Sequence, residues 1–207
     1  TRGPEISDVR KILEAVRGQL RNYAMVRLLF DCALRASEVV SLDLRDLDAK
    51  QRRLWIMGKG RSEREPITLP AVTLSAILAY VEAERGHKAG PLFVSEYDED
   101  HSMRLEGGRM TYRALWHVVR HAGIVAGVRT LIRPHGLRHA AITQALQVTG
   151  GDVVTVQRFS RHTNVQTVLV YNDNRLDKGG EVANLIAIDG AEDLKRTREA
   201  DASKNES

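Results

Sequence analysis

The sequence predicts an α+β fold, mainly α-helical with a small antiparallel β-sheet. Apolar residues recur at three- and four-residue spacing in several stretches, which indicates amphipathic helices, and the first of these covers residues 6–19. An alternating segment, residues 53–57, and a second segment, residues 65–69, flank a glycine-containing turn, which is typical of a β-hairpin. The 207 residues, 43% of them hydrophobic, are enough for one sizeable core.

The other elements follow from the same periodicity and from local capping signals. Further helices are predicted over residues 22–34, 71–85, 111–126, 136–148, 153–159 and 165–171. The helix over residues 22–34 is more apolar than the one over residues 6–19 and is expected to be central. Ser37 is expected to cap a short helix over residues 38–42, and Asp152 to cap the helix that follows it. Residues 44–47 are predicted to form a short strand, and residues 96–108 a mobile polar loop.

Positive charge is concentrated in the body of the chain. The net charge is +4, but from Asn172 onward nine acidic residues outnumber six basic ones, so residues 1–171 carry +7. Residues 129–162 contain a single acidic residue, Asp152, and five arginines: Arg129, Arg133, Arg138, Arg158 and Arg161. Because the planar guanidinium group binds phosphate through parallel hydrogen bonds, this distribution favours contact with a polyanion such as nucleic acid.

Several classes of protein are disfavoured by what the sequence lacks. No apolar run approaches the length of a membrane span, and the first residues have no signal-peptide pattern. The single cysteine, Cys32, lies in an apolar run and cannot form an internal disulfide, which favours a buried thiol in a reducing compartment. No Cys/His cluster has zinc-ligand spacing and no nucleotide phosphate loop occurs, so we expect neither a metal nor another cofactor.

The C-terminal half carries the most suggestive group of side chains. His135 and Arg138 are three residues apart on a helix expected to begin near Pro134, so both can point at one small anion. Tyr171, nine residues after His162, would supply a hydroxyl able to attack a phosphate. An isolated tyrosine is far more often a packing residue, so these residues alone do not define an activity.

Residues in the N-terminal half complete a pattern. Arg35 lies at a junction between two helices, and Glu38 follows at a spacing that allows an ion pair. Lys59 lies between two glycines at a hairpin tip. Each of the three is ordinarily just a solvated charge. Across residues 6–188, however, the chain resembles the catalytic domain of the tyrosine recombinase (phage integrase) family. The resemblance rests on the order and spacing of Arg35, Glu38, Gly58-Lys59-Gly60, His135, Arg138, His162 and Tyr171.

The resemblance implies that domain's fold and a phosphate-binding role for four side chains. Arg35 and Arg138 would hold the non-bridging oxygens of the scissile phosphate and stabilise its pentacoordinate transition state. His135 and His162 would donate further hydrogen bonds. Glu38 would support the geometry of these side chains.

The resemblance also implies the chemical steps of DNA recombination, as in integration or excision of mobile elements. Tyr171 would attack the phosphorus in line, giving a 3′-phosphotyrosine link and a free 5′-hydroxyl, and His135 is placed to take the tyrosine proton. Lys59 would protonate the leaving 5′-oxygen. Because the covalent link retains the energy of the phosphodiester, a second strand can be joined without a cofactor.

Further basic residues are expected to contact double-stranded DNA, and these are Arg61, Arg64, Arg109, Arg113, Arg133 and Arg161. One of them departs from the family pattern, in which glycine commonly precedes the second histidine. A glycine there lets backbone approach backbone, whereas Arg161 must point away or join the phosphate contacts.

We expect a catalytic domain over residues 1–190 and a charged, disordered tail over residues 191–207. The family's N-terminal core-binding domain is missing, which indicates an excised fragment. An apolar patch over residues 182–188 would dock onto a neighbouring protomer, in a homotetramer on DNA, or onto its own body. The resemblance implies a cytoplasmic, nucleoid-associated protein of prokaryotic or phage origin with no membrane partner.

Two other functions remain open from the sequence. A type IB topoisomerase would share the fold and the tyrosine nucleophile, but those enzymes usually carry lysine where this chain has His135. A catalytically inactive DNA-binding module would keep the fold, and the intact set of implied catalytic side chains argues against such a loss.

Overall fold

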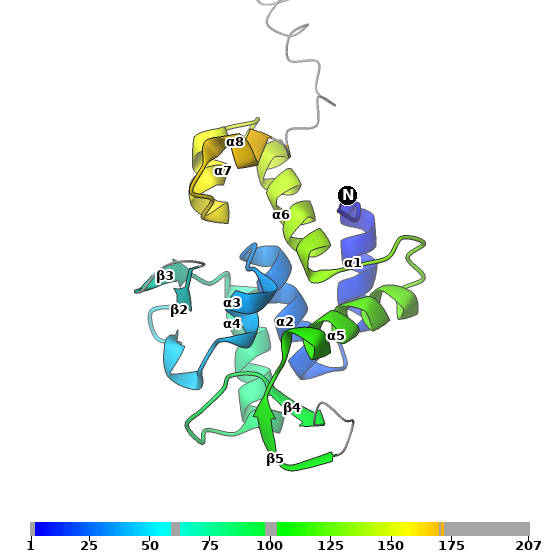
Figure 1. Ribbon diagram of the computed structural model, residues 1–207, viewed down its shortest axis with the longest axis vertical. Helices are drawn as coiled ribbons and strands as arrows, with labels where there is room; N and C mark the ends of the chain where they lie inside the picture. The colour runs from blue at the N-terminus through cyan, green and yellow to red at the C-terminus, as the bar shows by residue number, and fades with distance from the viewer. Residues whose placement is uncertain (1–2, 59–62, 98–102, 170, 172–207) are drawn as a thin grey trace, which may run out of the picture. The chain divides into compact units, whose positions relative to one another are not determined.

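Helices make up most of the chain that the structure describes, with two small antiparallel sheets beside them (Figure 1). This computed structural model describes residues 3–58, 63–97, 103–169 and 171, and all of these belong to one compact unit, Thr1–Asn172. The architecture confirms the predicted α+β fold class. Within the described ranges, no helix has both the length and the apolar character needed to cross a bilayer.

The centre of the core is the helix predicted to be central. α2 (Leu20–Asp31) packs against α1 (Ile6–Ala15), α4 (Ala71–Tyr80) and α6 (Pro134–Val148). Its buried residues are Ala24, Met25, Val26, Leu28 and Leu29. Because these buried residues lie on more than one face of the helix and three other helices pack against it, α2 is fixed on several sides. The turn that follows it, which carries Arg35, therefore starts from a rigid element.

A three-stranded antiparallel sheet follows α3 (Ala36–Val40) in the chain. Its strands pair in the order β1 (Leu47–Asp48), β2 (Arg53–Met57) and β3 (Arg64–Thr68). Leu54 and Ile56 are buried while Arg53 and Trp55 face outward, so β2 has the alternation that predicted it.

The strand expected over residues 44–47 is wrong for most of its length. Leu44–Asp46 instead forms a 3-10 turn, η1, and only Leu47 joins the sheet. The Asp46 carboxylate accepts the backbone N–H of Asp43 over 2.8 Å, which closes the chain into a turn before a strand can begin.

The helix predicted over residues 71–85 is confirmed, although its last turn, η2 (Val81–Arg85), is π-helical and ends at Gly86 with φ 71°. The polar loop predicted over residues 96–108 is wrong for the part that the structure describes. β4 (Val94–Tyr97) pairs there with β5 (Met103–Arg109) in an antiparallel ladder. Apolar and polar residues alternate in β5 only from Met103 to Glu106, before two glycines, so the sequence signal is short and the pairing depends largely on backbone hydrogen bonds that periodicity does not report.

Four helices complete the described fold: α5 (Tyr112–Val125), α6, α7 (Val153–Ser160) and α8 (Val165–Leu169). Asp152 caps α7 as predicted, because its Oδ1 accepts the Thr155 N–H over 3.0 Å. The C-terminal end of the described chain packs into a second hydrophobic cluster. This cluster consists of Ala33, Ala141, Ile142, Leu146, Val156, Val168 and Tyr171. This cluster joins α6, α7 and α8 to the turn after α2.

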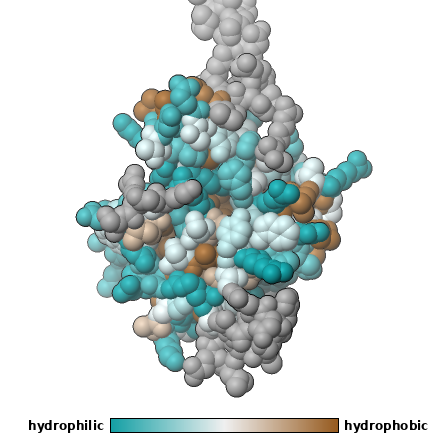
Figure 2. Space-filling view, viewed as in Figure 1, coloured by the Kyte–Doolittle hydropathy of each residue, from teal (hydrophilic) through white to brown (hydrophobic). Residues whose placement is uncertain are grey.

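Part of the exposed apolar surface lies at the same end of the domain. Figure 2 shows a largely hydrophilic face with several hydrophobic patches, one of them over α7 and α8. Val148, Val154 and Leu169 are all exposed there. An adjacent groove of about 360 Å³ is lined mainly by apolar side chains of α2, α6 and α7, among them Phe30, Ala145 and Phe159.

We predict that Ile142→Ala lowers the free energy of unfolding by about 3 kcal/mol, because it leaves a cavity beneath Tyr171. The matched change Ile124→Ala, at a site that is 64% exposed on α5, should stay within about 0.5 kcal/mol. Urea denaturation of the two variants measures both values. If Ile142→Ala lowers the free energy of unfolding as little as Ile124→Ala does, the second cluster is not a packed core.

Candidate active site

The first part of the site is the turn between α2 and α3. Ala33 takes a left-handed backbone conformation (φ 47°), which redirects the chain after α2. Arg35 then acts as the N-cap residue of α3, the position expected for Ser37. Its backbone N–H donates to Glu38 Oε2 over 2.8 Å, and its Nη1 donates to Oε1 over 2.7 Å. The Glu38 side chain is 2% exposed and that of Arg35 is 27% exposed, so a buried carboxylate aims a cation that remains accessible.

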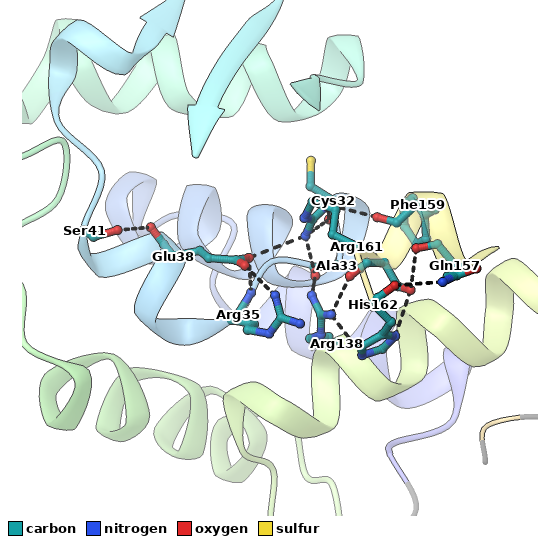
Figure 3. Close-up of polar contacts among 11 residues, drawn as sticks. Cys32, Ala33, Arg35, Glu38, Ser41, Arg138, Gln157, Phe159, Arg161 and His162 are labelled. Carbon is teal, nitrogen blue, oxygen red and sulfur yellow. Dashed lines mark hydrogen bonds and ion pairs between the residues drawn. The ribbon is translucent and has the colours of Figure 1, made fainter. Parts of the chain in front are cut away.

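Arg138 is the second guanidinium of the site, and it is almost completely buried. It lies in the second turn of α6, where Nη1 donates to the carbonyl of Ala33 and Nη2 to the carbonyl of Ser160 over 2.6 Å (Figure 3). Nη2 also lies 3.2 Å from His162 Nε2. The side chain therefore ties α6 both to the turn after α2 and to the end of α7.

Arg35 and Arg138 face the same region rather than opposite sides of the domain (Figure 3). Burial, and then the neighbouring charges of Arg35 and Arg161, lower the pKa of Arg138 to about 10. Arg138 and Arg161 share the Ala33 carbonyl, and Arg35 and Arg161 both contact Glu38, so the three guanidinium groups lie close together. At neutral pH Arg138 remains protonated, so the site keeps a dense positive charge.

The protonation of His162 follows from its two neighbours. A guanidinium N–H can only donate, so His162 Nε2 accepts from Arg138, and the ring proton is on Nδ1, 2.9 Å from Ser160 Oγ. Burial, and then the positive charges led by Arg138, lower the pKa of His162 to about 4. The ring is therefore neutral near pH 7. To donate from Nε2 to a phosphate, as the resemblance implies, it must first gain a proton on that nitrogen.

His135 lies in the first turn of α6, three residues before Arg138, and its side chain is exposed. Partial burial of the imidazole, and then the charges of Arg138 and Arg35, lower its pKa below the ordinary value. An accessible neutral imidazole at physiological pH is suited to accept a proton.

Tyr171 is packed into the site, with 8% of its surface exposed. Its ring centroid lies 5.8 Å from that of His162, with the rings nearly parallel, and 4.6 Å from that of His139. Just beyond α8, its backbone N–H donates to the Val168 carbonyl over 3.0 Å. The predicted nucleophile and the predicted phosphate-binding side chains thus belong to one site.

Arg161 adopts neither orientation expected from the sequence. It follows α7 in a left-handed conformation (φ 57°), and its side chain, 9% exposed, points into the protein. The terminal nitrogens donate to the carbonyls of Cys32, Ala33 and Phe159 over 2.9 to 3.2 Å. Nη2 also lies 3.5 Å from Glu38 Oε2. These contacts make Arg161 part of the protein scaffold around the site.

Two other arginines expected at DNA are held by carboxylates in this structure. Arg64 of β3 pairs with Asp46, and Arg109 of β5 pairs with Asp43 over 2.5 Å. Arg109 also donates to the Val40 and Leu42 carbonyls over 3.0 and 3.1 Å. Both guanidinium groups thereby tie a sheet to the segment after α3.

The remaining predicted side chains are distributed over the surface or fall outside the described ranges. Arg113 and Arg133 are exposed, and contact with DNA stays a prediction for them. Lys59 and Arg61, at the hairpin tip, lie outside the described residues, as does the segment 182–188.

Sequence reasoning missed three residues that shape the site. His139 contacts the Tyr171 ring and accepts the Gly3 N–H over 3.3 Å. The Ser160 hydroxyl accepts a hydrogen bond from His162 Nδ1–H over 2.9 Å, and the Gln157 side-chain amide donates to the His162 carbonyl over 3.1 Å. The sequence offered only closeness along the chain as a sign of these contacts: His139 follows Arg138, and Ser160 and Gln157 shortly precede His162. This sign is weak, because the contacts depend on how α6, α7 and α8 fold against one another.

The arrangement suits a phosphodiester. Three guanidinium groups, from Arg35, Arg138 and Arg161, surround the single carboxylate of Glu38, so positive charge is in excess. Preorganised donors of this kind stabilise the charge that accumulates when a phosphate is attacked. Across the residues whose placement is described, no group of three or more His, Cys, Asp or Glu side chains has the geometry to hold a metal ion.

Comparison with known proteins gives the same assignment. A model of the phage integrase family matches residues 5–177. A tyrosine recombinase of Synechocystis sp. is 35% identical over 175 residues, covering 84% of this chain and 54% of the relative. The tyrosine recombinase XerD of Mycobacterium leprae is 33% identical over 177 residues, covering 80% and 54%. The chain therefore spans about half the length of these curated relatives.

Solved structures share the fold. The XerA recombinase superposes with a TM-score of 0.73 at 21% identity, covering 89% of this chain and 63% of that one. The XerH site-specific recombinase, in a post-cleavage complex with its difH substrate, has a TM-score of 0.70 at 20% identity, with 88% and 53% covered. With the family match over most of its length and two relatives above 30% identity, the chain belongs to the phage integrase family of tyrosine recombinases.

Proposed function

We propose that this chain is the catalytic part of a site-specific DNA recombinase, which cleaves and rejoins DNA strands through a 3′-phosphotyrosine intermediate. One observation carries the proposal: Arg35, Arg138 and His162 converge beside Tyr171, although they come from separate segments of the chain. Packing alone has no need for two neighbouring guanidinium groups next to a buried tyrosine. A phosphate between the arginines would relieve their mutual repulsion.

The proposed reaction begins with a phosphodiester bound by the free N–H groups of Arg35 and Arg138. The Tyr171 oxygen attacks the phosphorus and gives its proton to a base, for which the neutral His135 is suited. The bond from phosphorus to the 5′-oxygen breaks, and that oxygen takes a proton from Lys59. Attack by another strand's 5′-hydroxyl on the phosphotyrosine reverses these steps and rejoins the DNA, with no net change in the number of phosphodiester bonds.

The relatives support double-stranded DNA as the substrate, since XerH and the Tn1549 transposon integrase were solved with DNA. Action on DNA would place this chain at the nucleoid in the cytoplasm. A type IB topoisomerase would use the same nucleophile, but it would relax supercoils without joining partner sites. An inactive DNA-binding module would form no covalent link at all.

We predict that the chain forms a covalent adduct with a nicked suicide DNA substrate, detected as a shifted band in denaturing electrophoresis. Tyr171→Phe should abolish the adduct and keep DNA affinity, because only the hydroxyl is lost. The control Tyr112→Phe, at a site that is 55% exposed on α5, should form the adduct normally. Adduct formation by Tyr171→Phe would exclude Tyr171 as the nucleophile.

The pH dependence of the rate of adduct formation should show whether His135 is the base that accepts the Tyr171 proton. Because the pKa of His135 lies below its ordinary value of 6.5, the imidazole is neutral at pH 7, and the rate should fall only as the pH drops below about 6.5. His135→Gln should slow adduct formation by about a hundredfold and remove this acid limb. An acid limb that persists in the variant would assign proton transfer to another group.

We further propose that the apolar segment 182–188 of one copy docks on a neighbouring copy in a tetramer on DNA. The exposed apolar groove between α2, α6 and α7 supports this, because it offers apolar surface close to the site. Docking there would couple the position of Tyr171 in one copy to the presence of the next.

Deleting residues 181–207 should therefore reduce self-association on DNA in sedimentation experiments and slow adduct formation. The expected cause is loss of apolar contact area rather than loss of the fold. If neither self-association nor adduct formation changes, the docking proposal is rejected.

A further inference from the structure

Arg161 occupies a backbone conformation that disfavours it. The residue that ends a helix in the left-handed region is usually glycine, because a Cβ atom clashes there with the neighbouring backbone. Arg161 takes this conformation after α7 with φ 57°. Its Nε is buried and has no hydrogen-bond acceptor among the described residues. A side chain kept under two such penalties must make contacts that compensate for them.

Those contacts join two parts of the site that are distant in sequence. The Cys32 and Ala33 carbonyls stand at the end of α2, where backbone acceptors lack helical partners and carry partial negative charge. The Phe159 carbonyl belongs to the last turn of α7. The Arg161 guanidinium group therefore bridges the turn that leads to Arg35 and the helix end that leads to His162.

Arg161 also adds a contact to the Glu38 carboxylate. Arg35 donates to Oε1 from its side chain over 2.7 Å and to Oε2 from its backbone N–H over 2.8 Å, and Oε2 also lies 3.5 Å from Arg161 Nη2. A buried carboxylate beside two cations on opposite oxygens has one favoured orientation. Figure 3 shows Glu38 between these two guanidinium groups, with Arg138 beside them.

The same link extends to Arg138. The Ala33 carbonyl accepts from both Arg138 and Arg161, so the two guanidinium groups are fixed relative to each other through one oxygen atom. Because the protein acceptors occupy the terminal nitrogens of Arg161, its contribution to phosphate binding is indirect.

We propose that Arg161 is a positioning residue for strand cleavage, which locks the Arg35–Glu38 pair and the Arg138–His162 pair into one geometry. This positioning role rests on the proposed function, because strand cleavage is the reaction that Arg161 would support. In this role the residue acts through its neighbours and does not touch the DNA. The guanidinium group of Arg161 thereby forms a fixed link across the site.

The test compares Arg161→Gly, Arg161→Lys and a matched control in the full chain. Glycine accepts a positive φ, so Arg161→Gly removes the guanidinium group without adding backbone strain. Arg52→Gly is the control, because Arg52 is also left-handed (φ 52°) and is exposed. We expect Arg161→Gly to slow adduct formation on the suicide substrate by about tenfold to a hundredfold, through misplacement of the phosphate-binding groups. DNA affinity should stay within about twofold, and Arg52→Gly should match the unaltered chain.

Either of two results with Arg161→Gly would overturn the proposal. If Arg161 binds phosphate directly, Arg161→Gly will weaken DNA binding and reduce the salt dependence of log K by about one unit. If Arg161 merely supports the fold, the melting temperature will fall while the folded variant cleaves at the normal rate. The double variant with Glu38→Gln should lose less than the product of the two single effects, because both changes release the same link.

A second readout does not depend on cleavage. The Arg161 charge contributes to the lowered pKa of His162, so an NMR titration should show this pKa rising from about 4 in Arg161→Gly. Arg161→Lys keeps the charge but not the planar fork, so it should leave the titration nearly unchanged and still slow cleavage. A His162 titration that is the same in Arg161→Gly would refute the proposal, even if the unaltered chain formed no adduct.

Discussion

The site depends on the burial of one charge, the guanidinium group of Arg138. Removing a cation from water costs several kcal/mol unless hydrogen-bond acceptors compensate for it, and such a group tolerates little displacement of its partners. Arg138 is 1% exposed, and its partners are two backbone carbonyls and His162. Those carbonyls belong to the turn after α2 and to the end of α7. Burying this cation therefore requires three distant segments to meet, and the side chains next to them in sequence, Arg35 and His162, come together as a consequence.

The same crowding of positive charge gives the site its chemical character. The arginines repel one another and contribute to the lowered pKa of His162, with Glu38 as the buried carboxylate near them, so the positive charges place the site under electrostatic strain. In the proposed reaction an incoming phosphate would relieve this strain, and the doubly charged transition state would relieve it further, so stabilisation would grow as the reaction proceeds. The neutral imidazole of His135 would then be available to accept a proton. One arrangement of charges would thereby serve stability, binding and catalysis.

Much of this architecture could be predicted from the sequence, and the exceptions have physical causes. Helices with strong periodicity and side-chain caps, such as the one after Asp152, appear where they were predicted, because those signals are local. The strand β5 does not follow from the sequence, because its alternation covers only four residues before two glycines and backbone pairing forms the rest of the ladder. The catalytic candidates followed from the order of residue types, which a family resemblance preserves. The inward path of Arg161 and the contact of His139 with Tyr171 did not follow, because each depends on a tertiary approach of helices that no spacing encodes.

The most direct test of the central claim is a crystal structure of the Tyr171→Phe variant bound to a DNA duplex, since the variant should bind without reacting. The account predicts that Arg35 and Arg138 each place an N–H within about 3 Å of a non-bridging oxygen of the same phosphate, with residue 171 on the side opposite the 5′-oxygen. Arg138 should keep at least one of its backbone carbonyl partners in that complex. A duplex held only by surface arginines such as Arg113 and Arg133, with no phosphate between Arg35 and Arg138, would contradict the account.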